Sequence, residues 1–213
     1  MKISSILNVV LAVALVFLSV QLAKGGEPAK SSPSGDDAVY NNILSRASVR
    51  SYQDKAVEND KVEKLLSAGM AAPSAVNKQP WHFVVVTDKQ VLASLAEANP
   101  HAEYAKEAPL AIVVCGDMDK ALEGEAREFW VQDCSAATQN ILLAAHGMGL
   151  GAVWTGAYPS MERCNAIAKV LQLPQTMIPL NIIVLGYPDG NVKPKDKWKP
   201  QNVSYNVFGG KAK

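Results

Sequence analysis

The sequence has few cysteines, few histidines and almost no net charge. Its three cysteines, Cys115, Cys134 and Cys164, form no CxxC pair, which argues against a disulfide framework and against a zinc site. The three histidines also lack metal-ligand spacing, so we expect no metal site. A formal net charge of +1 gives no field suited to a polyanion, and nucleic-acid binding is therefore not expected.

The motifs of common nucleotide-binding and hydrolytic folds are absent as well. There is no GxGxxG after a strand pattern, no GxxxxGK[ST] and no GxSxG. A glycine-rich segment, GMGLGAVWTG at residues 147–156, follows a long helical pattern instead of preceding one. It is either a helix end with a tight turn or a backbone that lies close to a flat ligand.

The N-terminus carries the longest apolar run. Lys2 is followed by the apolar residues 6–20 and then by small residues at Ala23 and Gly25, a pattern typical of a secretory signal. We expect residues 1–25 to be a cleaved signal peptide or a retained N-terminal anchor with possible membrane contact. Residues 26–36, rich in Pro, Ser, Gly and Lys, are expected to form a flexible linker. The protein is therefore predicted to be exported, either periplasmic or anchored outside the cytoplasm, with its folded domain over residues 37–213.

The full chain is 48% hydrophobic. The residues after the linker can therefore bury the core of one domain. Apolar periodicity predicts helices over residues 37–46, 60–72 with Asn59 as N-cap, 89–98, about 127–146 and 161–171 with Ser160 as N-cap. Buried strands are predicted over residues 82–87, 109–117 and 180–188, with a short apolar strand after the glycines. Because these elements do not alternate strictly, we expect an α+β domain in which helices cover a mixed β-sheet.

Two basic segments could bind an anion. In the extended sequence RASVRSY, the side chains of Arg46, Ser48 and Arg50 lie two apart and would point the same way, as a phosphate site requires. The alternative is a solvated strand edge. The sequence VKPKDKWKP near the C-terminus supplies lysines that include Lys195 and Lys197, and its alternative is a soluble tail.

A loop before the first strand exposes several hydrogen-bonding groups. Residues 72–80, APSAVNKQP, place Ser74, Asn77 and Gln79 between two prolines, directly before an apolar strand. The segment is either an ordinary helix-to-strand connection or a binding loop held between rigid elements. Further on, a charged run over residues 123–128 precedes Phe129 and Trp130; it is either a solvated helix face or a mobile cover over a site.

Taken in order, five segments resemble the nitroreductase family of flavin mononucleotide (FMN) enzymes over residues 43–203. They are RASVRSY, APSAVNKQPWHFVVV, APLAIVV, LLAAHGMGLGAVWTG and VLGYPDG followed by KPKDKWKP. The resemblance implies an α+β fold forming an intertwined homodimer, with two FMN sites at the subunit interface. It implies that the following residues bind FMN: Arg46, Ser48, Arg50, Pro73, Ser74, Ala75, Asn77, Gln79, Thr155, Gly156, Lys195 and Lys197.

The resemblance also implies roles for these residues. Arg46, Lys195 and Lys197 match phosphate-binding positions, Ser48 a phosphate and ribityl contact, and Arg50 the pyrimidine end of the flavin. The loop over residues 73–79 would reach the flavin bound mainly by the partner chain. Thr155 and Gly156 match the backbone that faces flavin N5.

The implied reaction is a ping-pong transfer of hydride. NADH or NADPH would reduce the flavin at N5 and leave, and a nitroaromatic, quinone or similar acceptor would then take its place. The cofactor carries the chemistry, so no side chain is catalytic in the strict sense. Phe129 and Trp130 are candidate walls of the substrate pocket, although either could be a core residue.

Two features depart from the family pattern, and two alternatives stay open. The export signal leaves open which reductant the protein uses. Lys197 stands where arginine is common in the family; lysine keeps the positive charge but cannot form the bidentate contact of a guanidinium. One alternative is a reductive dehalogenase of the iodotyrosine deiodinase type. Its lid uses Glu, Tyr and Lys, whereas ALEGEAREFW at residues 121–130 has neither Tyr nor Lys. The other alternative is a flavin-binding redox protein without small-molecule turnover.

Overall fold

The computed structural model describes residues 35–212. The predicted signal or anchor and most of the predicted linker lie outside these residues. Within residues 35–212, no helix is long and apolar enough to span a membrane. The chain divides into an N-terminal unit that ends at Tyr40 and a larger unit that starts at Asn41. The first helix, α2 (Gly35–Ser45), runs through this boundary and confirms the helix expected at residues 37–46.

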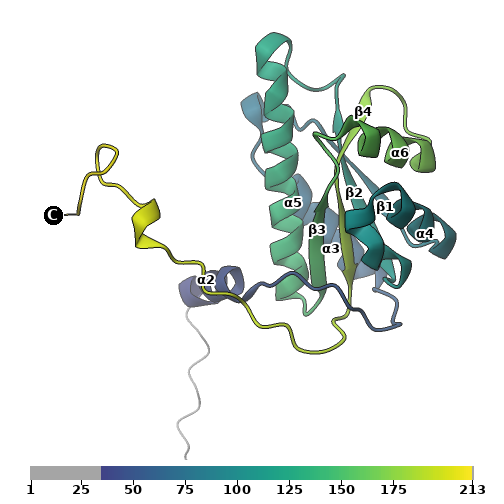
Figure 1. The fold of residues 1–213 in the computed structure, drawn as a ribbon, viewed down its shortest axis with the longest axis horizontal. Helices are drawn as coiled ribbons and strands as arrows, with labels where there is room; N and C mark the ends of the chain where they lie inside the picture. The colour runs from purple at the N-terminus through teal and green to yellow at the C-terminus, as the bar shows by residue number, and fades with distance from the viewer. Residues whose placement is uncertain (1–34, 213) are drawn as a thin grey trace, which may run out of the picture. The chain divides into compact units, whose positions relative to one another are not determined.

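A four-stranded sheet forms the centre of the larger unit, in the order β1-β2-β4-β3 (Figure 1). The strands are β1 (Trp81–Val86), β2 (Leu110–Asp117), β3 (Gly151–Gly156) and β4 (Met177–Gly186). All three pairings between them are antiparallel. The predicted α+β class is confirmed, but the mixed character of the sheet is limited to one isolated parallel bridge, between Ser48 and Ala152.

Helices cover both faces of the sheet, which explains why the central strands β2 and β4 are buried and mostly apolar. On β2, Ala111, Val113 and Cys115 belong to one core cluster, which includes residues of α4 (Lys89–Ala98) and α6 (Met161–Leu171). The alternate residues of β2 belong to a second cluster, with α3 (Asn59–Met70) and α5 (Phe129–Gly147). Figure 1 shows α5 along one side of the sheet and α4 and α6 on the other.

Most element boundaries follow local sequence signals. The helices predicted over residues 89–98 and 161–171 are confirmed, with Asp88 and Ser160 accepting hydrogen bonds from backbone N–H groups of the first turn. The N-cap prediction for Asn59 is wrong, because Asn59 is already helical and the cap position is Glu58.

Two other boundaries shift for local reasons. The helix α5 begins at Phe129, after residues 124–128 form the 3-10 helix η3 (Gly124–Glu128). The strand β4 begins at Met177, earlier than predicted. It carries Pro179 opposite a bulge between Val114 and Cys115, where a proline is tolerated in a strand.

Candidate active site

The segment that carries Arg46, Ser48 and Arg50 lies extended along the outer edge of β3. The backbone N–H of Val49 donates to the carbonyl of Ala152 at 3.0 Å, beside the parallel bridge of Ser48. Val49 is buried, Arg46 and Ser48 are half-buried, and Arg50 is exposed. The segment is therefore fixed to the sheet by its backbone, while its polar side chains stay accessible.

The far end of β3 presents free backbone donors. The N–H of Ala157 donates inward to Leu180, whereas the carbonyl of Ala152 faces outward, to Val49. Because hydrogen bonding alternates along an antiparallel strand, the N–H groups of Trp154 and Gly156 face the outer edge. A Cβ atom on Gly156 would meet nothing within 4 Å, so the backbone here is open to close approach by a ligand.

A cavity of about 360 Å³ lies at this edge and brings together Arg50, Thr155 and Gly156. Thr155 contributes backbone alone, because its hydroxyl is buried and donates to the carbonyl of Ile182 at 2.8 Å. The opposite wall comes from the 3-10 helix η2 (Pro100–Lys106), and its lining residues are Pro100, His101, Glu103 and Tyr104. Sequence reasoning missed this wall; the Asn99-Pro100 pair signals a turn at its start but nothing about its neighbours.

The residues that lead into the second basic segment lie beside the first. The backbone N–H of Asp189 donates to Ser51, and that of Gln53 donates to Tyr187. Lys195 and Lys197 further along are exposed, and no contact joins them to Arg46 in the described chain. Within residues 35–212, none of the four cations at Arg46, Arg50, Lys195 and Lys197 forms an ion pair. They are therefore available to an anionic ligand.

Tyr187 anchors the chain just before this second basic segment. Its hydroxyl donates to Glu58 Oε2 at 2.6 Å and accepts from Lys61 Nζ at 2.7 Å, while Lys55 Nζ lies 3.7 Å from the ring centroid. The hydrogen bond from Tyr187 is the main reason that the pKa of Glu58 falls to about 2. The separate hydrogen bond that Lys61 donates to the Tyr187 hydroxyl raises the pKa of Lys61.

The loop before β1 has a strained backbone. Val76, Asn77 and Gln79 have φ values of 50°, 57° and 50°, in the left-handed region that a β-branched residue such as Val76 rarely enters. Ser74 Oγ accepts from the N–H of Gln79 at 2.9 Å, and Gln79 Nε2 donates to Asn77 Oδ1 at 3.1 Å. The loop is thus held in one shape, with Asn77 and Gln79 exposed.

A buried carboxylate anchors this loop to α5. Asp133 is 6% exposed and accepts from the N–H of Ala75 at 2.9 Å. Sequence reasoning missed Asp133, whose signal was an acidic residue on the apolar side of the long helix.

The two groups of predicted flavin contacts lie at opposite edges of one sheet. Of the group at β3, Arg50, Thr155 and Gly156 line the cavity with η2. Gln79 lines a different cavity of about 430 Å³ with Trp81 and Phe83 of β1. With β2 and β4 between them, the two edge strands are three inter-strand spacings apart, about 14 Å. Within one chain the structure does not bring the two groups together.

The two candidate substrate-pocket residues differ in burial. Trp130 is 2% exposed and packs into the core, edge-on to Tyr158 at 4.9 Å between ring centroids. Phe129 is 44% exposed at the start of α5. Trp130 is therefore a core residue, and Phe129 alone presents a surface to solvent; the assignment of the pair to a substrate pocket stays a prediction.

The described chain shows no activated nucleophile and no group of side chains that could hold a metal ion. Burial raises the pKa of the cysteine thiols, that of Cys115 to about 12. His146 Nε2 lies 2.8 Å from Ser45 Oγ, but the Ser45 hydroxyl donates to the carbonyl of Asn41 and accepts from the imidazole. The geometry thus offers binding surfaces and open backbone, as a cofactor-dependent site requires.

Comparison with known proteins gives this geometry a family. Residues 43–187 match the model of the Nitroreductase family. The chain belongs to the nitroreductase family. Among the nitroreductase-family relatives, a protein of Methanothermobacter thermautotrophicus is 46% identical over 165 residues, which cover 78% of this chain and 85% of the relative. That relative carries the provisional name NADH dehydrogenase/NAD(P)H nitroreductase.

Solved nitroreductase structures confirm the fold. A provisionally named NADH dehydrogenase/NAD(P)H nitroreductase from Parabacteroides distasonis superposes with a TM-score of 0.76 at 47% identity, covering 79% of this chain and 98% of its own. An FMN-dependent nitroreductase from Clostridium difficile superposes with a TM-score of 0.73 at 31% identity, covering 79% and 99%. An iodotyrosine deiodinase from Haliscomenobacter hydrossis is also similar, 29% identical over 70% of this chain and 78% of its own.

Proposed function

We propose that this protein is a homodimeric oxidoreductase that passes hydride from NAD(P)H, through FMN, to a nitroaromatic, quinone or similar acceptor. As a nitroreductase-family protein it is an NAD(P)H-dependent flavin oxidoreductase, with FMN as its cofactor. The observation that carries the proposal is the open edge of β3. There the accessible backbone of Gly156 shares one cavity with Arg50.

The residues at this edge fit the parts of FMN. A phosphate that carries nearly two negative charges is bound best by several fixed cations in a partly dry site. Arg46, Lys195 and Lys197 form no ion pair with the residues that the structure describes. Ser48 adds a hydroxyl beside Arg46. The guanidinium of Arg50 would lie at the pyrimidine end, where a positive charge favours the reduced, anionic ring. The outward N–H of Gly156 would face N5.

When bound, FMN supplies the redox chemistry: it accepts hydride at N5 and passes it to the acceptor. The chain's own part is to bind and orient the cofactor and to exclude water, so no activated nucleophile is needed among residues 35–212. NAD(P)H and the acceptor would use the same open face in turn, which gives ping-pong kinetics. Phe129, exposed at the start of α5, is a candidate wall for both.

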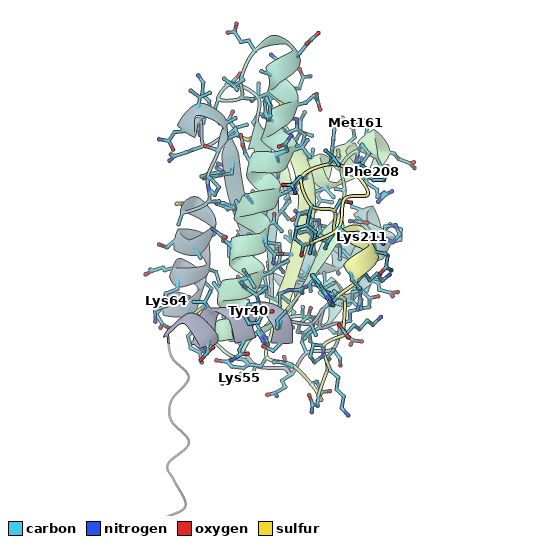
Figure 2. The ribbon with its side chains drawn as sticks, turned by 90° about the vertical axis from the view of Figure 1, so that its left-hand side faces the viewer. Tyr40, Lys55, Lys64, Met161, Phe208 and Lys211 are labelled. Carbon is cyan, nitrogen blue, oxygen red and sulfur yellow. The ribbon has the colours of Figure 1, made fainter. Side chains whose placement is uncertain are left out.

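The second group of contacts would come from a partner chain. Pro73, Ser74, Ala75, Asn77 and Gln79 lie at the opposite edge of the sheet from Arg50 and Gly156. A single chain cannot present both groups to one flavin, whereas two copies related by a two-fold axis can complete two sites. Exposed apolar residues on the C-terminal tail, among them Trp198 (73%) and Phe208 (102%), fit such an interface. Phe208 is labelled on this tail in Figure 2.

The first test is the visible spectrum of the purified full-length chain, before and after NADH or NADPH is added without air. We expect a flavin spectrum that bleaches and that returns on addition of a quinone or a nitroaromatic. Reoxidation by a halotyrosine instead would support the deiodinase alternative. Flavin that neither nucleotide bleaches would support a redox protein without turnover. No flavin after incubation with FMN would overturn the proposal.

We also propose that the protein is exported, on the basis of residues 1–25. Export predicts that the protein fractionates outside the cytoplasm, and that its mature N-terminus is Gly26 if the signal is cleaved after Gly25. Recovery of the full-length chain in the cytoplasmic fraction would contradict it.

A further inference from the structure

The 3-10 helix η2 brings an aromatic ring to the guanidinium of Arg50. Arg50 Cζ lies 5.7 Å from the centroid of the Tyr104 ring, within the range of a cation–π contact. Both residues line the cavity that also contains Thr155 and Gly156. Residue 104 is not among the positions to which the family resemblance gives a role, and it lies 54 positions from Arg50 in the sequence.

The ring of Tyr104 is a fixed platform. Tyr104 is half-buried and packs against the core cluster formed with α4 and α6. Its carbonyl accepts from the N–H of Ala108 at 3.2 Å. The whole of η2 is tied to β3 by the buried Asn99, whose Oδ1 accepts from the N–H of His101 and whose Nδ2 donates to the carbonyl of Gly156, both at 3.2 Å.

Arg50, in contrast, has little else to hold it. Its side chain is exposed and forms no ion pair or hydrogen bond with the residues that the structure describes. Glu103, the carboxylate of the same cavity, is not paired with it. A long side chain without partners samples many rotamers, so the Tyr104 ring decides how often the guanidinium lies at the cavity.

We propose that Tyr104 is a positioning residue that holds Arg50 at the pyrimidine end of the flavin and so raises the affinity for reduced over oxidised FMN. The inference rests on the proposed function, because it requires FMN in this cavity. The physical link is the distance dependence of the Coulomb interaction: the reduced ring carries a negative charge that the oxidised ring lacks, so only its binding depends strongly on where the guanidinium lies.

The test uses the full-length chain with Tyr104→Leu, Tyr104→Phe, Arg50→Gln and the double variant Arg50→Gln/Tyr104→Leu. The measurements are the midpoint potential of bound FMN and the dissociation constant of oxidised FMN. In Tyr104→Leu we expect the preference for reduced FMN to fall about two- to fivefold, the size of an exposed cation–π contact. Fivefold corresponds to a potential about 20 mV lower for a two-electron couple. Tyr104→Phe keeps the ring and should keep the parental potential.

The double variant separates positioning from a general structural effect. If Tyr104 acts through Arg50, Tyr104→Leu should not change the potential once Arg50 is glutamine. An equal shift in both backgrounds, or an unchanged potential in Tyr104→Leu, would overturn the inference. A parent chain that binds no FMN would overturn the proposed function itself, so the two failures are distinguishable. If Tyr104→Leu does not fold, a lowered potential in the ring-retaining Tyr104→Phe would still contradict the inference.

Discussion

The two edges of the sheet carry the two groups of predicted flavin contacts in different ways. At β3, the Arg46–Arg50 segment is fixed by backbone pairing to a strand, and the strand offers unstrained backbone with open space at Gly156. At β1, the contacts lie on a loop with three non-glycine residues at positive φ, held by its own side chains and by Asp133.

This difference indicates a division of work. A cofactor that must be bound tightly gains from the rigid edge with its cations. A loop that completes a partner's site must keep its shape while exposed, and here local hydrogen bonds hold that shape against the backbone strain. We therefore predict that the β3 edge determines the affinity for FMN, and that the loop determines the turnover of the bound flavin.

The largest effect should come from separating the two edges onto different chains. Arg46→Glu disables the β3 edge by reversing a charge, and Asn77→Gly removes the loop amide while keeping a residue that tolerates positive φ. Each homodimer should lose nearly all activity. Coexpressed with two affinity tags, the two chains should form heterodimers with one intact site, and an equal mixture should recover roughly a quarter of the parental activity.

The control for this experiment is a chain that carries both substitutions, coexpressed with the parent. Its heterodimers also have one β3 edge and one loop intact, but on the same chain, so an interface site gives no working site in them. If the site is shared, heterodimers purified through both tags should be active in the first mixture and inactive in the control mixture. Activity only in the control heterodimers, which keep one unaltered chain, would show that one chain holds the whole site.

Two glycines offer a matched test of the β3 edge. Gly156→Ala adds a methyl group to open space and should leave the melting temperature unchanged, while FMN affinity falls about tenfold, within the usual cost of overpacking. Gly116→Ala places Cβ 2.3 Å from Trp130 Cε3, inside the core. It should lower the free energy of unfolding by about 1–3 kcal/mol. Calorimetry and flavin titration on both variants measure the two effects; a destabilised Gly156→Ala would contradict an open edge.

In the loop before β1, in contrast, a glycine substitution should stabilise the fold. Val76 is 82% exposed at a φ of 50°, so Val76→Gly removes strain and little packing. The relief of about 1–2 kcal/mol exceeds the entropy cost of glycine, and we expect the free energy of unfolding to rise by about 0.5–1 kcal/mol. FMN turnover should fall because the loop is less ordered. Val76→Ala, which keeps the strain, is the control, and lower stability of Val76→Gly would show that the loop is not strained.

The sequence predicts best where the signals are local. The helices α4 and α6 are predicted at their observed bounds because capping residues and apolar spacing lie within one segment. The alternation of Arg46, Ser48 and Arg50 likewise needs only an extended backbone, which the bridge at Ser48 provides. The contacts with flavin themselves came from the family resemblance.

The parts that the sequence does not predict depend on distant partners. The wall of η2 faces Arg50 from 54 residues away and is a 3-10 helix without apolar periodicity. Asp133 holds Ala75 across 58 positions. Trp130 is a core residue only because Gly116 leaves space for its ring, and no local pattern reports that space.

The smallest expected effect tests how the second basic segment is tied to the β3 side of the molecule. Glu58 accepts from Tyr187 and lies near Lys61, and its pKa falls from 4.5 to about 2. A carboxylate with a lowered pKa stabilises the folded state above its unfolded value, and this contribution is lost as the pH falls from about 4.5 to 2. Stability should therefore decline through this window, measured as the urea midpoint.

In Glu58→Gln the decline should be shallower, because the variant has no carboxylate to protonate. Since the Glu58 side chain is exposed, solvent screens the effect. A decline of equal steepness in both proteins would show that Tyr187 does not hold the segment through Glu58.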